Sequence, residues 1–187
     1  FNIDLMYGLP GQDVAQALAD VVNAIAAKPA HISHYELTLE PNTLFAVRPP
    51  AGLPDDERAM DIAAACRDRL AAAGYERYEI SAYAQPDRQS RHNLNYWRYG
   101  DYLAIGAGAH GKLTDAENRV LRTARQRHPR DFQANAGSEK AIAERRAIKP
   151  AERVFEFMLN NSRLLEGGHP EDFERITGLD AARLLPG

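Results

Sequence analysis

The first 84 residues alternate between short apolar runs and amphipathic stretches. Residues 1–7 are strand-like and end at a Gly-Leu-Pro-Gly turn over residues 8–11. Apolar side chains then recur at helical spacing, which predicts a helix from about Asp13 to Ala27. The apolar positions that predict its buried face are Val14, Leu18, Val21, Val22 and Ile25. Residues 32–39 and 75–83 predict two further strands.

A second helix is predicted between the second and third strands. Asp55 suits the N-cap and Gly74 suits the residue after the C-cap. The apolar residues expected on its buried stripe are Ile62, Cys66, Leu70 and Ala73. The order strand, helix, strand, helix, strand is typical of parallel α/β units with right-handed crossovers.

The pattern changes after Gln85. Residues 92–102 are polar and aromatic, and residues 103–111 are small and rich in glycine. Apolar residues on both sides of residues 114–118 predict a hairpin. Beyond Pro129 the pattern is mainly helical, and one predicted helix, 151–165, places Val154, Phe155, Met158 and Leu165 on a common face. We therefore expect three regions, namely residues 1–84, 85–125 and 126–187.

Composition narrows the class of protein. The chain has 187 residues, 44% of them hydrophobic, which excludes disorder and collagen as the main state. No apolar run approaches the roughly 20 residues that a membrane helix needs. The net charge of −3 gives no electrostatic reason to expect nucleic acid. The chain begins at Phe1 without an initiator Met or a signal peptide, and we expect it to be a piece of a longer protein.

The only cysteine is Cys66. One cysteine excludes a disulfide framework, a zinc ribbon and a complete set of iron–sulfur ligands within this chain. We expect a reducing, cytoplasmic setting, with Cys66 as a small core residue.

Two features of the sequence have competing interpretations, namely a glycine-rich segment and a set of polar residues on the predicted strands. Residues 106–111 match G-x-G-x-x-G, but a dinucleotide site needs a helix to follow, whereas residues 112–115 lead into the hairpin. The small residues are better explained by close approach of the backbone to another surface or ligand. Asp4, Thr38 and Glu40 are predicted on strands, at or toward the edge of the sheet where parallel barrels build active sites. The alternative is that they are ordinary solvent-facing groups.

The segment HNLNYW (residues 92–97) concentrates unusual chemistry, and we expect it outside regular structure. Its imidazole, phenol and indole can hold a flat aromatic ligand, or they form an aromatic loop packed over a barrel end. The other histidines considered lack ligand spacing and are expected to be surface or core residues; they are His31, His34, His128 and His169. A solvated basic face is expected from Arg122, Arg125, Arg127 and Arg130.

Five motifs occur in the order found in one family. They are IDLMYGLPGQ (3–12), ISHYELTLEPNTLF (32–45), YEISAYA (78–84), HNLNYW (92–97) and GAGAHGK (106–112). In these motifs the chain resembles the HemW-type heme chaperones, radical S-adenosylmethionine proteins related to oxygen-independent coproporphyrinogen III oxidase. The resemblance covers essentially the whole chain.

The resemblance implies an α/β fold, the C-terminal half of a partial (β/α)6 barrel followed by a small α+β or helical C-terminal region. It also implies three groups to be bound: a [4Fe–4S] cluster on a Cys-x3-Cys-x2-Cys loop, S-adenosylmethionine and heme. The cysteine loop is missing here, so the cluster ligands are expected outside this chain, which alone should be inactive. By matching motif positions, Asp4, Thr38 and His110 are expected to contact S-adenosylmethionine, the last two through backbone atoms. His92 is expected to contact heme, with Tyr96 and Trp97 stacking on it.

The implied function is heme trafficking, with transient delivery of heme to a respiratory protein. Oxidative decarboxylation of coproporphyrinogen III by an oxidase is the enzymatic alternative. A third interpretation is an α/β fragment without ligand whose open strand edges pair in a homodimer.

Overall fold

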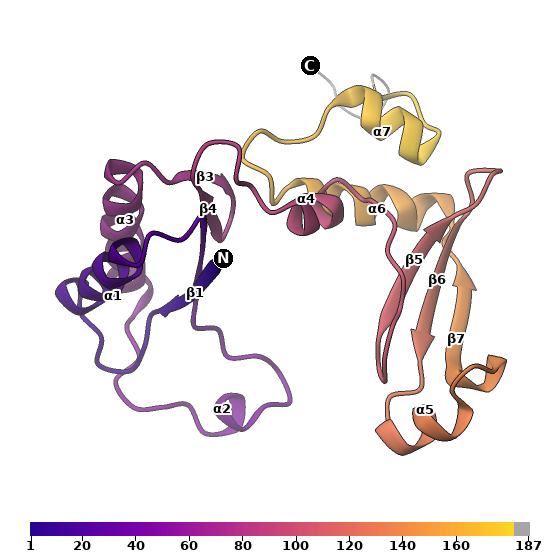
Figure 1. The fold of residues 1–187 in the computed structure, drawn as a ribbon, viewed down its shortest axis with the longest axis horizontal. Helices are drawn as coiled ribbons and strands as arrows, with labels where there is room; N and C mark the ends of the chain where they lie inside the picture. Colours follow the sequence, from indigo (N-terminus) through magenta and orange to yellow (C-terminus); the bar gives the residue numbers. More distant parts are fainter. Residues whose placement is uncertain (182–187) are drawn as a thin grey trace. The chain divides into compact units, whose positions relative to one another are not determined.

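The computed structural model describes residues 1–181, and the chain forms two compact units, Phe1–Ser90 and Arg91–Gly187 (Figure 1). Across the described residues, no helix is both long enough and apolar enough to cross a bilayer. The third expected region, 126–187, extends past these residues, because its last six lie outside them.

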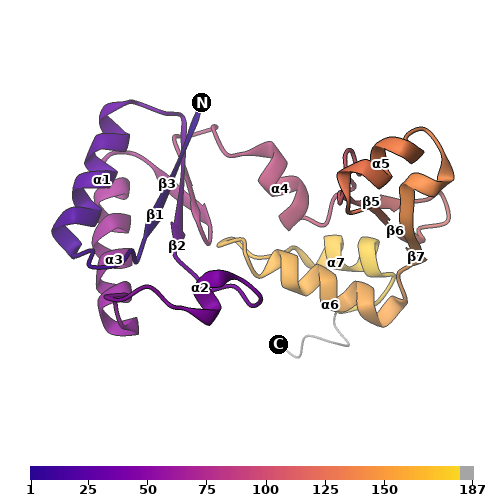
Figure 2. The ribbon, with the colours of Figure 1, turned by 90° about the horizontal axis from the view of Figure 1, so that it is seen from below.

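The first unit is a four-stranded sheet with two long helices on one face. In chain order its elements are β1 (Asn2–Tyr7), α1 (Val14–Ala26), β2 (His31–Glu36), α2 (Leu44–Val47), α3 (Asp56–Ala72), β3 (Glu76–Glu79) and β4 (Ala82–Ala84). The strand order is β1-β2-β4-β3, and β1 runs parallel to β2 with Asn2 opposite His31. Figures 1 and 2 both show α1 and α3 side by side against the sheet.

Both predicted helices of this unit are confirmed, and their ends follow from local chemistry. The Asp13 carboxylate accepts from the Gln16 backbone N–H at 2.8 Å, and the Gln16 side chain accepts from the Asp13 N–H, which forms a capping box for α1. Asp55 caps α3 by accepting from the Arg58 N–H at 2.9 Å. Gly74 follows the last turn of α3 with φ of +81°, a conformation that glycine adopts without a steric penalty.

The core of this unit lies between the sheet and the two helices. Its most buried members include Val21, Ile32, Ile62, Cys66 and Leu70. The Cys66 side chain is fully buried, and burial raises the pKa of its thiol to about 11, so it packs as a small core residue as predicted. The predicted face of α1 is wrong at Val22, which is 42% exposed, because the small Ala17 and Ala24 turn toward the core.

The single strand predicted over residues 75–83 is also wrong. The structure has a tight hairpin, β3 and β4, and β4 runs antiparallel to β2 with His31 opposite Ala84. The Arg77 guanidinium closes this turn by donating to the Ile80 carbonyl at 2.5 Å. Because the turn is held by a side chain and contains no Gly or Pro, the sequence pattern gave no turn signal.

The second unit combines a three-stranded antiparallel sheet with helices. Its elements are α4 (Arg91–Trp97), β5 (His110–Thr114), β6 (Val120–Arg125), α5 (Pro129–Asn135), the 3-10 helix η1 (Glu139–Ala141), β7 (Ile142–Ala147), α6 (Pro150–Asn161) and α7 (Pro170–Thr177). The sheet order is β5-β6-β7, and the pairing of β5 with β6 confirms the predicted hairpin. Its core includes Tyr99, Val120, Ile148, Phe157 and Phe173.

Two expectations about which side chains of this unit are buried are wrong. In α6 the buried face carries Arg153 and Phe157, whereas Phe155 is 67% exposed. The helix turns this way because Phe157 packs edge-on against Phe173 of α7, with ring centroids 5.6 Å apart. Arg122 does not belong to a solvated face, since it is half-buried and pairs with Glu156 at 2.7 Å.

Candidate functional site

Asp4 lies on the face of the first sheet that α1 and α3 leave uncovered. Alternate residues of β1 point to opposite faces, so Ile3 and Leu5 pack toward the helices while Asp4 and Met6 are exposed on the other face. The register places Asp4 opposite Ser33 of β2. The Asp4 carboxylate is therefore accessible on a polar sheet face, as a group that binds donor atoms of a ligand would need to be.

A connected set of polar side chains surrounds Asp4 on this face. Asn2 Nδ2 donates to Asp4 Oδ1 at 2.7 Å, and His31 Nδ1 lies 2.7 Å from Asn2 Oδ1. His31 Nε2 lies 2.8 Å from the Tyr78 hydroxyl, and Ser33 donates to Asn2 Oδ1 at 3.3 Å. His31 is 7% exposed, and burial lowers its pKa, although the charge of Asp4 opposes this.

Thr38 lies two residues past the end of β2, whereas the sequence pattern predicts it within the strand. Its side chain is exposed, and its hydroxyl donates to the Glu40 carboxylate at 3.0 Å. Thr38 and Asp4 belong to the first unit, whereas His110 belongs to the second.

His110 opens β5, and its side chain is exposed. The glycine-rich segment before it leads directly into this strand, as predicted, and not into the helix that a dinucleotide-binding loop requires. Close backbone approach is real at Gly111, where an added Cβ would lie 2.9 Å from the Ala104 nitrogen. The small residues here thus serve packing of the strand against the preceding loop.

The segment predicted to lie outside regular structure forms a short helix, α4. The helical spacing places His92 and Tyr96 on one face, with ring centroids 4.9 Å apart and ring planes at 70°. Tyr96 in turn contacts the Tyr102 ring at 4.5 Å. His92 itself is exposed at the end of this aromatic row.

The aromatic row is anchored by an ion pair. The Arg122 guanidinium donates to the Tyr102 hydroxyl at 2.6 Å and to the Glu156 carboxylate at 2.7 Å. Glu156 also accepts from the Tyr99 hydroxyl at 2.6 Å. Burial alone would raise the pKa of Glu156, but these donors hold it below its usual value.

Trp97 does not share the face of His92 and Tyr96. Its ring lies under the Arg163 guanidinium, 4.3 Å from it, and its carbonyl accepts from the Asn161 side chain at 3.0 Å. The structure therefore brings His92 and Tyr96 together and sets Trp97 against a different neighbour.

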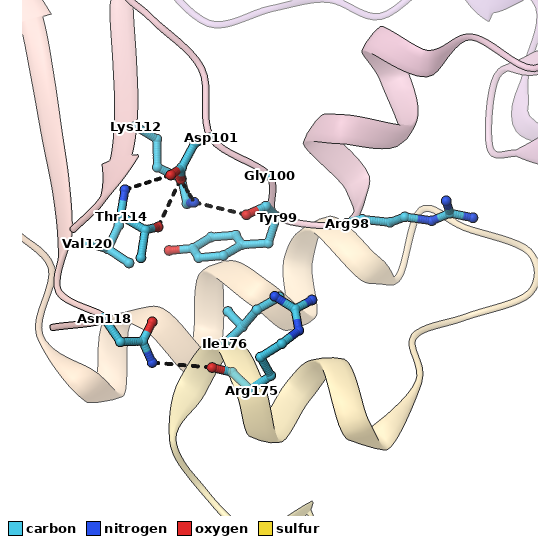
Figure 3. A pocket seen from close by; sticks show the side chains of 10 residues that line it. All are labelled: Arg98, Tyr99, Gly100, Asp101, Lys112, Thr114, Asn118, Val120, Arg175 and Ile176. Carbon is cyan, nitrogen blue, oxygen red and sulfur yellow. Dashed lines mark hydrogen bonds and ion pairs between the residues drawn. The ribbon is translucent and has the colours of Figure 1, made fainter. Parts of the chain in front are cut away.

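A polar pocket of about 400 Å³ in the second unit was not identified from sequence. Figure 3 shows Asp101 and Lys112 side by side at one edge of it, with the Tyr99 ring beneath them. Lys112 is 2% exposed, and its ammonium donates to Asp101 at 2.7 Å and to the Tyr99 carbonyl at 2.9 Å. A lysine at the end of a glycine-rich, otherwise uncharged run was the signal that could have indicated a buried cation.

The positive charge of Lys112 in this pocket is compensated by the carboxylate of Asp101. Burial lowers the pKa of Lys112, and its hydrogen bond to Asp101 opposes that shift. Burial would raise the pKa of Asp101, yet donors from Lys112 and Thr114 lower it. Within residues 1–181, no three His, Cys, Asp or Glu side chains gather as a metal site would require.

Comparisons with known proteins bear on these residues. The chain is 49% identical over 179 residues to the heme chaperone HemW of Escherichia coli (strain K12), covering 96% of this chain and 46% of that protein. It is 48% identical to the heme chaperone HemW of Haemophilus influenzae, with 96% and 45% covered. The chain thus spans about half the length of the curated relatives it matches. No family model matches it.

A solved structure is similar in fold. It is described by the words "Coproporphyrinogen III oxidase (HemN) from Escherichia coli is a Radical SAM enzyme", and the TM-score is 0.74 at 18% identity. The match covers 98% of this chain and 44% of that one. This likeness concerns the fold alone, and it confirms the α/β fold class expected from the sequence motifs.

Proposed function

Because the chain is homologous to the HemW heme chaperones over nearly its whole length, we propose that it carries the heme contact of such a chaperone. The observation that carries this proposal is the row His92–Tyr96–Tyr102, in which an exposed imidazole ends a line of aromatic rings. Neutral imidazole nitrogen is a common iron ligand, and aromatic rings pack well on a porphyrin face. His92 would hold the cargo iron, while Tyr96 lies against the macrocycle.

The fit of the row to a heme depends on its rigidity. Tyr102 accepts a hydrogen bond from Arg122, and Arg122 also pairs with Glu156, so Tyr96 packs against a ring that is held by these contacts. Trp97 is engaged by Arg163 and supports α4 from another side. We therefore assign heme contact to His92 and Tyr96, with Trp97 as a support for the helix that presents them.

S-adenosylmethionine is the second group we propose for this protein. The exposed Asp4 carboxylate can accept from ribose hydroxyls or from the methionyl ammonium, and an anion on a polar sheet face suits both donors. Thr38 is proposed as a backbone contact only, because its hydroxyl already donates to the Glu40 carboxylate. When bound, the molecule supplies a sulfonium centre and an adenosyl group.

The residues of this chain do not fit a [4Fe–4S] cluster. Such a cluster takes thiolate ligands, whereas the one cysteine, Cys66, is fully buried in the first core with its thiol protonated. The ligands of any cluster would have to come from outside this chain.

The recipient we propose for the heme is a respiratory protein that accepts it in a transient complex in the cytoplasm. The exposed position of His92 supports transfer, because a cargo held at the surface can pass to a partner without unfolding the carrier.

The proposal is tested by anaerobic titration of the full-length protein with heme, monitored at the Soret band. Saturable binding that His92→Ala weakens at least about tenfold is expected. Anaerobic turnover of coproporphyrinogen III to protoporphyrinogen IX, without saturable heme binding, would overturn the proposal in favour of the oxidase.

A further inference from the structure

The polar side chains beside Asp4 form a chain of hydrogen bonds whose direction is fixed at the Asp4 end. At one end, the Ser90 backbone N–H can only donate, and it lies 3.3 Å from the Tyr78 hydroxyl oxygen. At the other end, an ionised Asp4 can only accept, so the group of Asn2 that faces it is the amide NH2. The direction of the bonds between these ends follows from the Asp4 end, because the Tyr78 oxygen can accept from Ser90 and still either donate to His31 or accept from it.

Asn2 fixes the tautomer of His31. With its NH2 turned to Asp4, Asn2 presents its carbonyl oxygen to His31 Nδ1 and to the Ser33 hydroxyl. His31 Nδ1 must then carry the hydrogen, which leaves Nε2 of the neutral ring as an acceptor for the Tyr78 hydroxyl at 2.8 Å. The buried, neutral ring suits this arrangement, since burial lowers the pKa of His31.

We propose that this one-way chain, from Ser90 through Tyr78, His31 and Asn2, is a positioning device for Asp4. It occupies Asp4 Oδ1 with the Asn2 amide and presents Oδ2 on the open sheet face, where no hydrogen bond to it is found among the described residues. A carboxylate held in this way can accept hydrogen bonds on Oδ2 from vicinal hydroxyls or from an ammonium that approaches the open face of the sheet. The inference rests on the proposed binding of S-adenosylmethionine by Asp4.

The proposed positioning of Asp4 predicts how strongly each variant should lose affinity for S-adenosylmethionine. Asn2→Asp replaces the donor to Asp4 by a second carboxylate, so affinity for S-adenosylmethionine should fall about tenfold. His31→Leu should weaken binding about fivefold, because Asn2 loses the partner that orients its amide. Glu36→Gln is the matched control, since Glu36 contacts Tyr7 on the opposite face of the same sheet and should leave affinity unchanged.

Two measurements test the device separately from the proposed function. Long-range proton–nitrogen NMR of the full-length protein, labelled at histidine, should show His31 as the neutral Nδ1–H tautomer near pH 7.5. An Nε2–H tautomer or an imidazolium would overturn the proposed direction, whether or not any ligand binds. This readout needs no substitution and so remains available if His31→Leu fails to fold.

Calorimetric titration with S-adenosylmethionine supplies the second test. If Asp4→Asn does not weaken binding, the proposed S-adenosylmethionine contact is wrong. If Asp4→Asn abolishes binding while folded Asn2→Asp retains full affinity, the contact stands and the positioning role is overturned.

Discussion

At the scale of single residues, Lys112 shows how a buried charge organises a loop. Its ammonium joins the Tyr99 carbonyl and the Asp101 carboxylate to β5 and lies 4.1 Å from the centre of the Tyr99 ring. Only the lysine of this ion pair is buried, since the Asp101 side chain is 38% exposed, so removing Lys112 leaves the buried Tyr99 carbonyl without its donor and Asp101 without its cation. Lys112→Met should therefore lower the free energy of unfolding by about 2 kcal/mol in urea titrations.

A matched exposed pair provides the control for this prediction. Arg119 pairs with Asp115 at 2.7 Å, but its side chain is 72% exposed. Arg119→Met should cost less than about 1 kcal/mol. Equal losses for the two variants would mean that burial of Lys112 does not govern its contribution.

His34 makes the stability of the first unit depend on pH. Its ring is buried and stacks on Tyr7 with centroids 4.5 Å apart, and burial lowers its pKa from 6.5 to about 4, against the charge of Asp20. Between these two values the unfolded chain binds a proton that the folded chain does not, so stability falls as pH falls. We expect a loss of about 2 kcal/mol between about pH 7.5 and 5.

Urea unfolding of the wild-type protein and of His34→Phe at these two pH values measures this effect. Phenylalanine keeps a ring against Tyr7 and removes the titrating group, so the variant should depend less on pH. Burial also lowers the pKa of His31, so His31 contributes to the pH dependence that remains in the variant. An unchanged slope in the variant would assign the pH dependence to other groups.

At the scale of elements, helix ends were predictable, but strand pairing was predictable only in part. Asp13, Asp55 and Gly74 act through neighbours within a few residues, so the sequence pattern locates α1 and α3. The β3–β4 hairpin depends on Arg77 reaching the Ile80 carbonyl, which no local pattern indicates. Similarly, Phe157 and not Phe155 is buried because α7 supplies Phe173, a partner remote in sequence.

The residues of the candidate site were likewise predictable from sequence only in part. The concentration of functional side chains in residues 92–97 was evident from sequence, but their division between two faces follows from the helix that they form. The chain of hydrogen bonds at Asp4 joins β1, β2 and β3, so its members become neighbours only through strand pairing.

The end of α4 offers a test of how this helix presents His92. Gly100 donates its N–H to the Asn95 carbonyl at 2.6 Å, and an added Cβ would lie 2.8 Å from that same carbonyl oxygen. Gly100→Ala should therefore displace the last turn of α4 and weaken heme binding several-fold, by about 1 kcal/mol or more.

Gly137→Ala is the control for this substitution. At Gly137, φ is +78° and no atom lies within 4 Å of an added Cβ, so only local backbone strain of about 1 kcal/mol is introduced. Heme affinity should remain unchanged in this variant. An equal loss of affinity in both variants would contradict a specific role for the end of α4.

At the scale of the whole molecule, the two units carry different parts of the proposed chemistry. The first unit holds Asp4 and its hydrogen-bonded neighbours, and the second holds His92, Tyr96 and the ion pair that anchors them. The effect of a substitution in either unit can therefore be measured with the ligand proposed for that unit. Asp4→Asn should affect S-adenosylmethionine, and His92→Ala should affect heme.

The most direct test is a side-by-side Soret titration of the full-length wild-type protein, His92→Ala and His169→Ala. His169 is an exposed histidine of the same unit whose side chain makes no capping hydrogen bond, so it controls for loss of any surface imidazole. We expect saturable heme binding by the wild-type protein and by His169→Ala, with affinity at least about tenfold weaker and an altered Soret band in His92→Ala. Identical affinities and spectra for all three proteins would contradict the assignment of heme to His92.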